Sequence, residues 1–397
     1  MARLSLLTET FPPEVNGVSF TLARLARGLT QLGDQVEVIC PERTSTNNLD
    51  ENWSEFYIPS RKIPGYDDLR FGLLCKNLLI NHWRKNPPAL VYLATEGPAG
   101  YSALRACLQL GIPCVSGFHT NFDQYLKHYR LPFLKPLVDR YLVWFHNKTK
   151  VTFAPTHWMV DLLESKGYHN LVVFGRGVER DLFSPERRCM NLRKIHGVRQ
   201  DERILITVGR VAAEKNLDLT CEIFEQNMAL GLAKAAWVVG DGPEMERLRR
   251  KYPKVHFTGC LDKDELARHY ASADLFVFAS ETETFGNVVT EALGAGLPVV
   301  SYDYAAPGQY VIEGKNGSLI TLGNAVGLKT AVSEILKTPN AAFKEMKSFA
   351  RQSTESLDWE SILRGLRGEF INVSNDFKKN TGGFSQEFST EEKKSTA

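Results

Sequence analysis

Two glutamates, Glu283 and Glu291, lie eight residues apart where a predicted strand gives way to a predicted helix. The apolar run 275–279 predicts a buried strand, and apolar spacing predicts a helix from about Asn287. Ligands of open parallel α/β sheets bind at the carboxyl ends of strands, where a helix N-terminus offers N–H groups to phosphate. Two acids beside such an anion site predict a ligand that carries both phosphate and sugar hydroxyls.

Two cations follow another apolar run, 204–208, which also predicts a strand. Arg210 and Lys215 share the loop after it, and Gly209 precedes them. Arginine suits bidentate phosphate binding, and lysine acts as a point charge. Surface charges are usually only solvated, but these lie at the predicted sheet edge of the two glutamates. We therefore interpret them as phosphate ligands.

One residue at each of three further predicted strand ends can be interpreted in two ways. Gly17, in the loop 10–19, could approach a phosphate or belong to a rigid proline turn. Gly242, in the loop 239–243, could wall a nucleotide base or form a tight turn. His119 could face a ligand or be a structural histidine bonded to backbone. The chain contains no G-x-G-x-x-G, so the usual nicotinamide-binding fingerprint is absent.

The elements that must position these residues alternate between strand and helix. The predicted strands are 3–8, 35–40, 90–94, 114–118, 151–154, 171–174, 204–208, 236–239, 255–258, 275–279 and 298–302, with helices such as 18–32, 99–110 and 157–166 between them. This alternation is typical of parallel, doubly wound sheets. The fold class is thus α/β, with two Rossmann-like domains that face a cleft.

The pattern also predicts domain boundaries. We expect an N-terminal Rossmann-like domain at 1–177 and a second one at 178–356. A C-terminal helix within 357–374 should pack back on the N-terminal domain, and the polar residues 375–397 predict a disordered tail.

Composition narrows the function. A chain of 397 residues usually holds two cores, and a net charge of +2 gives no reason to expect nucleic acid as a partner. Seven cysteines, without a Cys-x-x-Cys pair, argue against a zinc site or a disulfide framework. The first apolar run is too short for a signal peptide, and no run approaches the roughly 20 residues of a membrane span. We expect a cytoplasmic protein that can touch the inner face of the membrane.

Taken together, these motifs resemble the family 4 retaining glycosyltransferases of the GT-B fold over about residues 3–372. The matching pieces are Pro13-Glu14-Val15-Asn16-Gly17-Val18, Gly209-Arg210 with Glu214-Lys215-Asn216, Gly240-Asp241-Gly242-Pro243, and Glu283 to Glu291, the family's E-x(7)-E motif. Residues 118–122 and 175–179 resemble the branch that contains GDP-mannose-dependent α-mannosyltransferases and sulfoquinovosyl-diacylglycerol synthases.

The resemblance implies that the N-terminal domain at 1–177 binds the acceptor and that the domain at 178–356 binds the nucleotide sugar. It also implies a role for each matched residue. It implies catalytic roles for Arg210, Lys215, Glu283 and His119, and donor-binding roles for Gly17, Gly209, Arg210, Lys215, Gly242, Glu283, Phe285, Gly286, Asn287 and Glu291. The two cations would bind the diphosphate, Glu283 the donor sugar and Glu291 the ribose.

The chemistry fits a transferase that needs no metal or other cofactor beyond its nucleotide-sugar cosubstrate. We expect cations and a helix N-terminus, in place of a metal, to stabilise the leaving diphosphate, each fixed donor by about 3 kcal/mol. We do not assign Glu283 and Glu291 as a glycosidase acid and nucleophile. A front-face displacement, in which the leaving phosphate accepts the acceptor's proton, needs no protein nucleophile.

The donor and the acceptor stay open. GDP-mannose is the first expectation and a UDP-sugar, used on a diacylglycerol-type lipid, is the alternative. The basic, aromatic segment 122–150 could lie on an anionic membrane or pack as a helix pair in the core, and the membrane interpretation predicts a lipid or lipid-linked glycan acceptor. A sugar-nucleotide epimerase shares this fold, but the Glu283–Glu291 loop with Phe285-Gly286 argues against it. The same loop, together with Arg210 and Lys215, argues against a non-catalytic binding protein.

Overall fold

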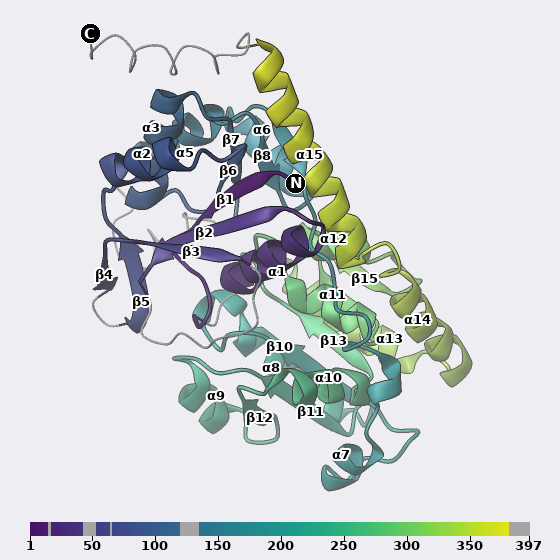
Figure 1. Cartoon of the computed structure of the whole chain (residues 1–397). Helices are drawn as coiled ribbons and strands as arrows, with labels where there is room; N and C mark the ends of the chain where they lie inside the picture. Colours follow the sequence, from purple (N-terminus) through teal and green to yellow (C-terminus); the bar gives the residue numbers. More distant parts are fainter. Residues whose placement is uncertain (15–16, 43–52, 64–65, 120–134, 381–397) are drawn as a thin grey trace, which may run out of the picture. The chain divides into compact units, whose positions relative to one another are not determined.

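The computed structural model describes residues 1–14, 17–42, 53–63, 66–119 and 135–380. These residues form two compact units (Figure 1). The first unit holds residues 1–154, 162–174 and those from 363 onward, and the second holds 155–161 and 175–362. The second unit therefore begins with a short segment from the sequence of the expected N-terminal domain.

In the described part of the first unit, seven parallel strands form a sheet in the order β3-β2-β1-β6-β7-β8-β9. They are β1 (Arg3–Leu7), β2 (Gln35–Pro41), β3 (Ser54–Ile58), β6 (Leu90–Leu93), β7 (Cys114–Gly117), β8 (Thr152–Ala154) and β9 (Leu171–Val173), and β4 (Ser60–Ile63) pairs antiparallel with β5 (Tyr66–Gly72). Its helices are α1 (Gly17–Gln31), α2 (Lys76–Lys85), α3 (Pro98–Leu110), α5 (Lys135–Asn147), part of α6 (His157–Ser165) and most of α15 (Trp359–Asn380). The central strands are apolar and buried because helices cover a parallel sheet on both faces.

Helix α15 packs within the first unit from Leu363 onward. A Cβ on Gly28 of α1 would lie 2.1 Å from the end of the Leu363 side chain, so a larger residue would force Leu363 to shift. Arg367 donates to both carboxylate oxygens of Asp34, at 2.6 and 3.0 Å. The C-terminal helix is thus tied to the N-terminal sheet layer by packing and by an ion pair.

The same helix corrects the predicted start of the tail. Residues 375–380 are helical, not disordered, because α15 continues to Asn380. Ser374 donates to the carbonyl of Ala89 at 3.3 Å, and Lys150 lies 5.2 Å from the centre of the Phe377 ring. These contacts continue past the expected helix end. The rest of the predicted tail, 381–397, lies outside the described residues.

The second unit contains six parallel strands among its described residues, in the order β12-β11-β10-β13-β14-β15. The strands are β10 (Ile204–Val208), β11 (Ala235–Val239), β12 (His256–Gly259), β13 (Leu275–Phe278), β14 (Val299–Tyr302) and β15 (Gly317–Ile320). The helices are α7 (Met190–Ile195), α8 (Leu217–Ala229), α9 (Met245–Lys251), α10 (Lys263–Ser272), α11 (Asn287–Gly294), α12 (Ala305–Tyr310), α13 (Ala325–Lys337) and α14 (Asn340–Gln352), with 3-10 turns η2 (Pro185–Arg187) and η3 (Ala213–Lys215). Two clusters of buried apolar side chains form its core.

The strand order of this unit reverses next to β10. The chain runs from β10 outward to β11 and β12, returns to pair β13 with β10, and then continues outward to β14 and β15. Such a reversal is a topological switch point, and ligands bind beyond the carboxyl ends of the strands there. The two strands that meet at the switch point are followed by the loops that carry Arg210 and Glu283.

Candidate functional site

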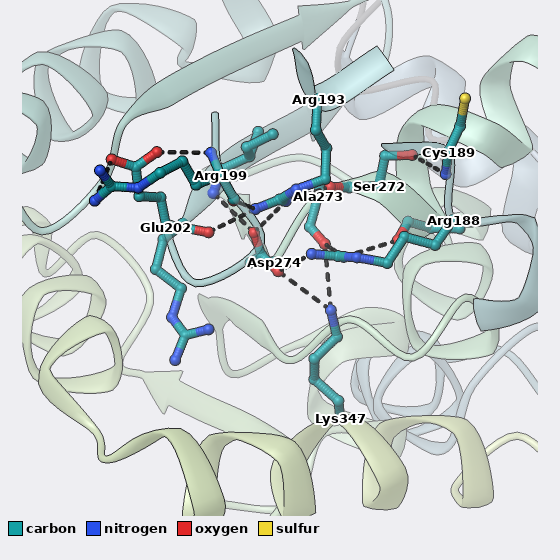
Figure 2. A network of polar contacts seen from close by, with 12 residues as sticks. Arg188, Cys189, Arg193, Arg199, Glu202, Ser272, Ala273, Asp274 and Lys347 are labelled. Atoms are coloured by element: carbon teal, nitrogen blue, oxygen red, sulfur yellow. Dashed lines mark hydrogen bonds and ion pairs between the residues drawn. The ribbon is translucent and has the colours of Figure 1, made fainter. Parts of the chain in front are cut away.

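Strands β10 and β13, which lead to the candidate site, are held together by a network of polar contacts around Asp274 (Figure 2). Asp274, directly before β13, accepts hydrogen bonds from Arg193 at 2.8 Å and from Arg188 at 3.0 Å. Lys347 of α14 approaches the same carboxylate at 3.4 Å, and the amide of Ile204, the first residue of β10, donates to it at 3.0 Å. One buried carboxylate therefore holds the starts of both strands in register.

The charges around Asp274 also set its protonation state. Burial alone would raise the pKa of its carboxyl, but Lys347, Arg188 and Arg193 together hold that pKa below its usual value. Burial in turn lowers the pKa of the Lys347 amine to about 8. Asp274 is thus a buried anion surrounded by three cations, and the strands leading to the site depend on it.

At the opposite ends of these strands, Lys215 and Glu283 are in contact. The ammonium of Lys215, at the end of η3, lies 2.5 Å from a carboxylate oxygen of Glu283, in the loop after β13. Both side chains are largely buried, with 22% and 12% of their surface exposed. Arg210 lies on the same loop as Lys215 but is 55% exposed, and its guanidinium is 3.9 Å from Glu214. A cation and an anion therefore meet at the switch point.

The glycines predicted for this edge let two loops pack backbone to backbone. Gly209 and Gly240 have φ values of +152° and +128°. A Cβ on Gly240 would lie 2.0 Å from the Gly209 carbonyl oxygen, and one on Gly242 would lie 2.4 Å from that of Val211. The loop after β11 is therefore fixed against the loop that carries Arg210 and Lys215.

Helix α11 starts beside the Lys215–Glu283 pair. Gly286, at φ +98°, precedes its first residue Asn287, and the carbonyl of Gly286 accepts from the amide of Val289 at 3.0 Å. Phe285 is only 1% exposed and anchors the turn in the core. The first amides of a helix have no carbonyl partner within it, so this end of α11 offers N–H groups to an anion.

Glu291, one turn along α11, lies in a different environment from Glu283. It is partly buried, and Tyr270 of α10 donates to its carboxylate at 3.1 Å. Burial raises the pKa of Glu291 to about 7, and the tyrosine hydrogen bond offsets only part of this effect. No sequence pattern indicates Tyr270, because its contact with Glu291 depends on the packing of α10 against α11.

Arg176 is a second residue near this site that sequence reasoning did not assign. Its side chain is 7% exposed, and it donates to the side-chain oxygen of Asn287 at 3.3 Å. Its guanidinium carbon lies 5.6 Å from the centre of the Phe285 ring. The two flanking glycines in Gly175-Arg176-Gly177 were the available signal for a tightly packed position.

Two of the predicted residues belong to the first unit. His119 is 8% exposed, and its Nε2 lies 2.7 Å from the hydroxyl of Tyr92. A Cβ on Gly117 would lie 2.0 Å from that hydroxyl. Gly17 is the exposed first residue of α1, and its carbonyl accepts from Thr21 at 2.7 Å.

The first unit also contains a chain of hydrogen bonds with the order of a hydrolase triad. Ser116 contacts Nδ1 of His146 at 2.9 Å, and Nε2 of His146 contacts Glu96 at 3.1 Å. These three side chains are at most 4% exposed, and Ser116 is also hydrogen-bonded to Thr149 and Thr152. A serine without solvent access cannot meet a substrate, so this network is structural.

The basic, aromatic segment is described only from residue 135. Along α5, Phe145 lies in the core of the first unit, and Tyr141 and Trp144 pack against that core. Leu137 on the same helix is 67% exposed, and Arg140 is exposed. Residues 122–134 of the predicted segment lie outside the described residues. The described half thus combines core aromatics with an exposed basic side.

Two kinds of feature are absent from the described residues. In the ranges given above, no helix is long and apolar enough to cross a membrane. In those same ranges, no group of three or more His, Cys, Asp or Glu side chains is placed to hold a metal ion.

Family models match both halves of the chain. The model described as Glycosyltransferase Family 4 matches residues 15–182, and the one described as Glycosyl transferases group 1 matches residues 202–338.

The chain is also similar to named proteins. It is 30% identical to a GDP-mannose-dependent alpha-mannosyltransferase of Mycobacterium tuberculosis, over 93% of this chain and 96% of that one. It is 29% identical to the sulfoquinovosyl transferase SQD2 of Arabidopsis thaliana, over 92% of this chain and 73% of that one. Among solved structures, Anabaena HepE in complex with UDP and glucose matches with a TM-score of 0.74 at 17% identity, over 94% of this chain and 100% of that one.

Proposed function

The chain belongs to glycosyltransferase family 4 and is a hexosyltransferase of the GT-B fold, and from that premise we propose that it moves mannose from GDP-mannose to a lipid or glycan acceptor with retention of configuration. The observation that carries the proposal is the contact between Lys215 and Glu283 at the switch point, beside the start of α11. A nucleotide sugar joins an anionic diphosphate to a polyol. A site with a cation and a carboxylate side by side suits both parts.

Each side chain has a role in this proposal. Lys215 and Arg210 stabilise the charge that develops on the leaving diphosphate, each by about 3 kcal/mol, and no metal is required. Glu283 accepts hydrogen bonds from the donor sugar, and Glu291 accepts them from the ribose. A carboxylate has about four acceptor positions, so Glu291 can accept from Tyr270 and from ribose hydroxyls together.

The proposed reaction is a front-face displacement. The bond between the sugar's anomeric carbon and the phosphate oxygen breaks while a bond to the acceptor oxygen forms on the same face. The proton of the acceptor hydroxyl passes to the leaving phosphate oxygen. His119 contacts the donor sugar in this scheme and Gly17 lies near the diphosphate. A glycosyl adduct trapped on Glu283 or His119 would refute the displacement.

GDP-mannose is the proposed donor because the mannosyltransferase relative aligns over nearly the full length of both chains. A UDP-sugar, used on a diacylglycerol-type lipid, is the alternative. Nucleotide release from GDP- and UDP-sugars distinguishes the two donors. Formation of an epimer without transfer would favour the epimerase instead.

The exposed residues on and beside helices α2, α3 and α5 support a peripheral contact with an anionic membrane. Helices α2 and α3 contain no acidic residue, and Asp139, the one acid of α5, is paired with Lys135 at 2.9 Å. These helices and the residues beside them expose Leu74, Leu78, Leu108 and Leu137 together with Arg84, Lys85, Arg105 and Arg140. Cations with exposed leucines suit a negatively charged lipid surface, and such a location fits a lipid acceptor.

Vesicle sedimentation tests the membrane contact. The wild type should bind vesicles that contain phosphatidylglycerol at low salt, and the double variant Arg105→Glu/Arg140→Glu should bind them at least tenfold more weakly. Lys337→Glu, at an exposed position of α13 in the second unit, is the matched charge reversal and should bind like the wild type. Equal binding by all three proteins would refute the proposal that this surface contacts the membrane.

Alanine variants of the two cations test the reaction. Lys215→Ala and Arg210→Ala should each lower turnover by roughly a hundredfold in an assay of GDP release from GDP-mannose. Lys329→Ala is the matched control, because Lys329 forms a similar pair with Glu222, at 2.7 Å, on α13 and α8. Normal turnover in both site variants would refute the assignment. Turnover of the wild type should persist with EDTA, and its loss would refute metal independence.

A further inference from the structure

The ring of Tyr270, on α10, is held on two sides by other aromatic rings of the second unit. It is fully buried, with its centre 5.7 Å from that of Phe183, which it meets edge-on, and 5.9 Å from that of Phe276 on β13. Its hydroxyl reaches α11, where the carboxylate of Glu291 lies at 3.1 Å and the carbonyl of Val288 at 3.3 Å. Because the ring is fixed, the position of its hydroxyl is fixed as well.

The two acceptors of this hydroxyl differ in strength. Val288 and Glu291 are three residues apart, so they lie on the same face of α11. A hydroxyl has one hydrogen to donate, and an ionised acceptor forms the stronger bond. The carbonyl of Val288 alone would give the buried hydroxyl the partner that it needs. Burial of the tyrosine therefore does not require the carboxylate.

The bond from Tyr270 restricts the orientation of the Glu291 carboxylate. A glutamate side chain is flexible, and ordering it costs conformational entropy. The hydroxyl contacts one oxygen, Oε2, and a carboxylate has about four acceptor positions, so others stay available to a ligand. A ligand that meets a carboxylate already held in place loses less entropy on binding.

The same bond favours the charged form of Glu291. Burial raises the pKa of this carboxyl to about 7, the hydrogen bond from Tyr270 lowers it most, Lys263 lowers it further, and Glu179 raises it. Lys263 and Glu179 form an ion pair with each other at 3.5 Å, so their effects on Glu291 oppose each other. The hydroxyl of Tyr270 is therefore the main group that keeps Glu291 ionised near neutral pH.

We propose that Tyr270 is a positioning residue for the nucleotide-sugar donor: its hydroxyl holds the Glu291 carboxylate in the orientation that accepts hydrogen bonds from the ribose. The proposal rests on the proposed function, because it needs a ribose at Glu291. Tyr270 is fully buried and acts only through the glutamate.

The variant Tyr270→Phe tests the proposal, with GDP-mannose as the donor, because it removes the hydroxyl and keeps the ring. It should raise KM by roughly 3- to 10-fold, the range of one hydrogen bond, while kcat stays close to the wild-type value. In the wild type, kcat/KM should rise with pH around 7 as Glu291 ionises. Without the hydroxyl the pKa of Glu291 is higher, so the midpoint of this rise should move up by about one pH unit.

The matched control is Tyr252→Phe. Tyr252, also in the second unit, donates to another carboxylate, that of Asp218, at 3.3 Å. The control should leave KM and the pH midpoint at their wild-type values, because loss of a tyrosine hydrogen bond elsewhere does not reach Glu291. An equal rise of KM in the control would overturn the proposal.

A double variant tests whether Tyr270 acts through Glu291. Because both changes affect the same carboxylate, Tyr270→Phe/Glu291→Gln should have a KM no higher than that of Glu291→Gln alone. Multiplied increases in KM would overturn the proposal. A wild-type KM and pH midpoint in Tyr270→Phe would also overturn it and would leave the proposed function standing. A wild-type protein that releases nucleotide from neither GDP- nor UDP-sugars would overturn both.

Discussion

Replacing Glu291 by glutamine should stabilise the protein at pH 8 and weaken its binding of the donor. Burial raises the pKa of Glu291 from 4.5 to about 7, so between these values the folded state binds a proton more tightly than the unfolded chain. The stability of the wild type therefore falls as pH rises from 4.5 to 7 and then levels off. A glutamine carries no charge at any pH, so the variant escapes this loss.

The size of the gain follows from the pKa shift. A rise of roughly 2.5 units corresponds to about 3 kcal/mol, because each unit is about 1.4 kcal/mol. Solvent screening at the partly exposed carboxyl reduces this value, so we expect a gain of about 1–3 kcal/mol at pH 8 and almost none at pH 4.5. Loss of the carboxylate should raise KM for GDP-mannose by roughly 10- to 100-fold, the range for hydrogen bonds to a charged group.

Urea unfolding at pH 5 and pH 8 measures the stability part, and initial rates at pH 8 measure the donor part. Glu334→Gln, at an exposed position of α13, is the control and should change neither quantity. A stability difference between Glu291→Gln and the wild type that is the same at both pH values would refute the argument from burial. A normal KM in the variant would refute the ribose role and leave the stability argument intact.

Three other predictions concern the scaffold. Asp274→Asn should lower the free energy of unfolding by about 3–5 kcal/mol in urea, because it leaves three cations without their carboxylate; a loss under 1 kcal/mol would contradict this. Burial lowers the pKa values of His196 and His256, whose rings lie 4.6 Å apart, and repulsion from His256 lowers that of His196 further, whereas His269 and Arg249 lower that of His256. Stability should therefore fall as pH drops below about 6.5, and His256→Gln should reduce that fall in urea midpoints; an equal fall in the variant would exclude these two histidines as its source. Gly240→Ala places a Cβ 2.0 Å from the Gly209 carbonyl at φ +128°, so it should lower the free energy of unfolding by at least about 2 kcal/mol, and an unchanged melting temperature would show that the loop can shift.

The sheets were predictable because their central strands are continuous apolar runs. The run 204–208 coincides with β10, and the run 275–279 exceeds β13 by one residue. Strands β3, β5 and β15 were missed because polar residues interrupt the apolar signal, as in Tyr66–Gly72. Strand β4, with two basic residues in four, gives no apolar signal at all.

The proximity of the two charged loops was also predictable, but their contacts were not. Carboxyl ends of neighbouring parallel strands meet at one sheet edge, and this reasoning placed Lys215 near Glu283. The hydrogen bonds of Tyr270 to Glu291 and of Arg176 to Asn287 join residues 21 and 111 positions apart. These hydrogen bonds depend on tertiary packing, so the spacing of apolar residues along the sequence does not indicate them.

The same limit applies to the boundary between the two units. Residues 155–161 were expected in the N-terminal domain, but they cluster with the second unit. The Trp158 ring packs edge-on against Tyr304 at 5.5 Å, and the amide of His157 lies 3.3 Å from the side-chain oxygen of Gln309. A pattern of alternating strands and helices locates a domain boundary only to within one strand–helix–strand unit, because the helix of that unit can pack against either domain.

The different environments of Glu283 and Glu291 bear on how the proposed reaction proceeds. A paired carboxylate and a carboxyl with a raised pKa could suggest the nucleophile and acid of a glycosidase. Those two groups, however, must face each other across one glycosidic bond. Glu283 faces Lys215 on the loop after β10, whereas Glu291 faces Tyr270 of α10. Carboxyls directed at different elements suit two separate parts of a ligand, which favours hydroxyl binding at both and leaves the charge of the leaving group to Lys215 and Arg210.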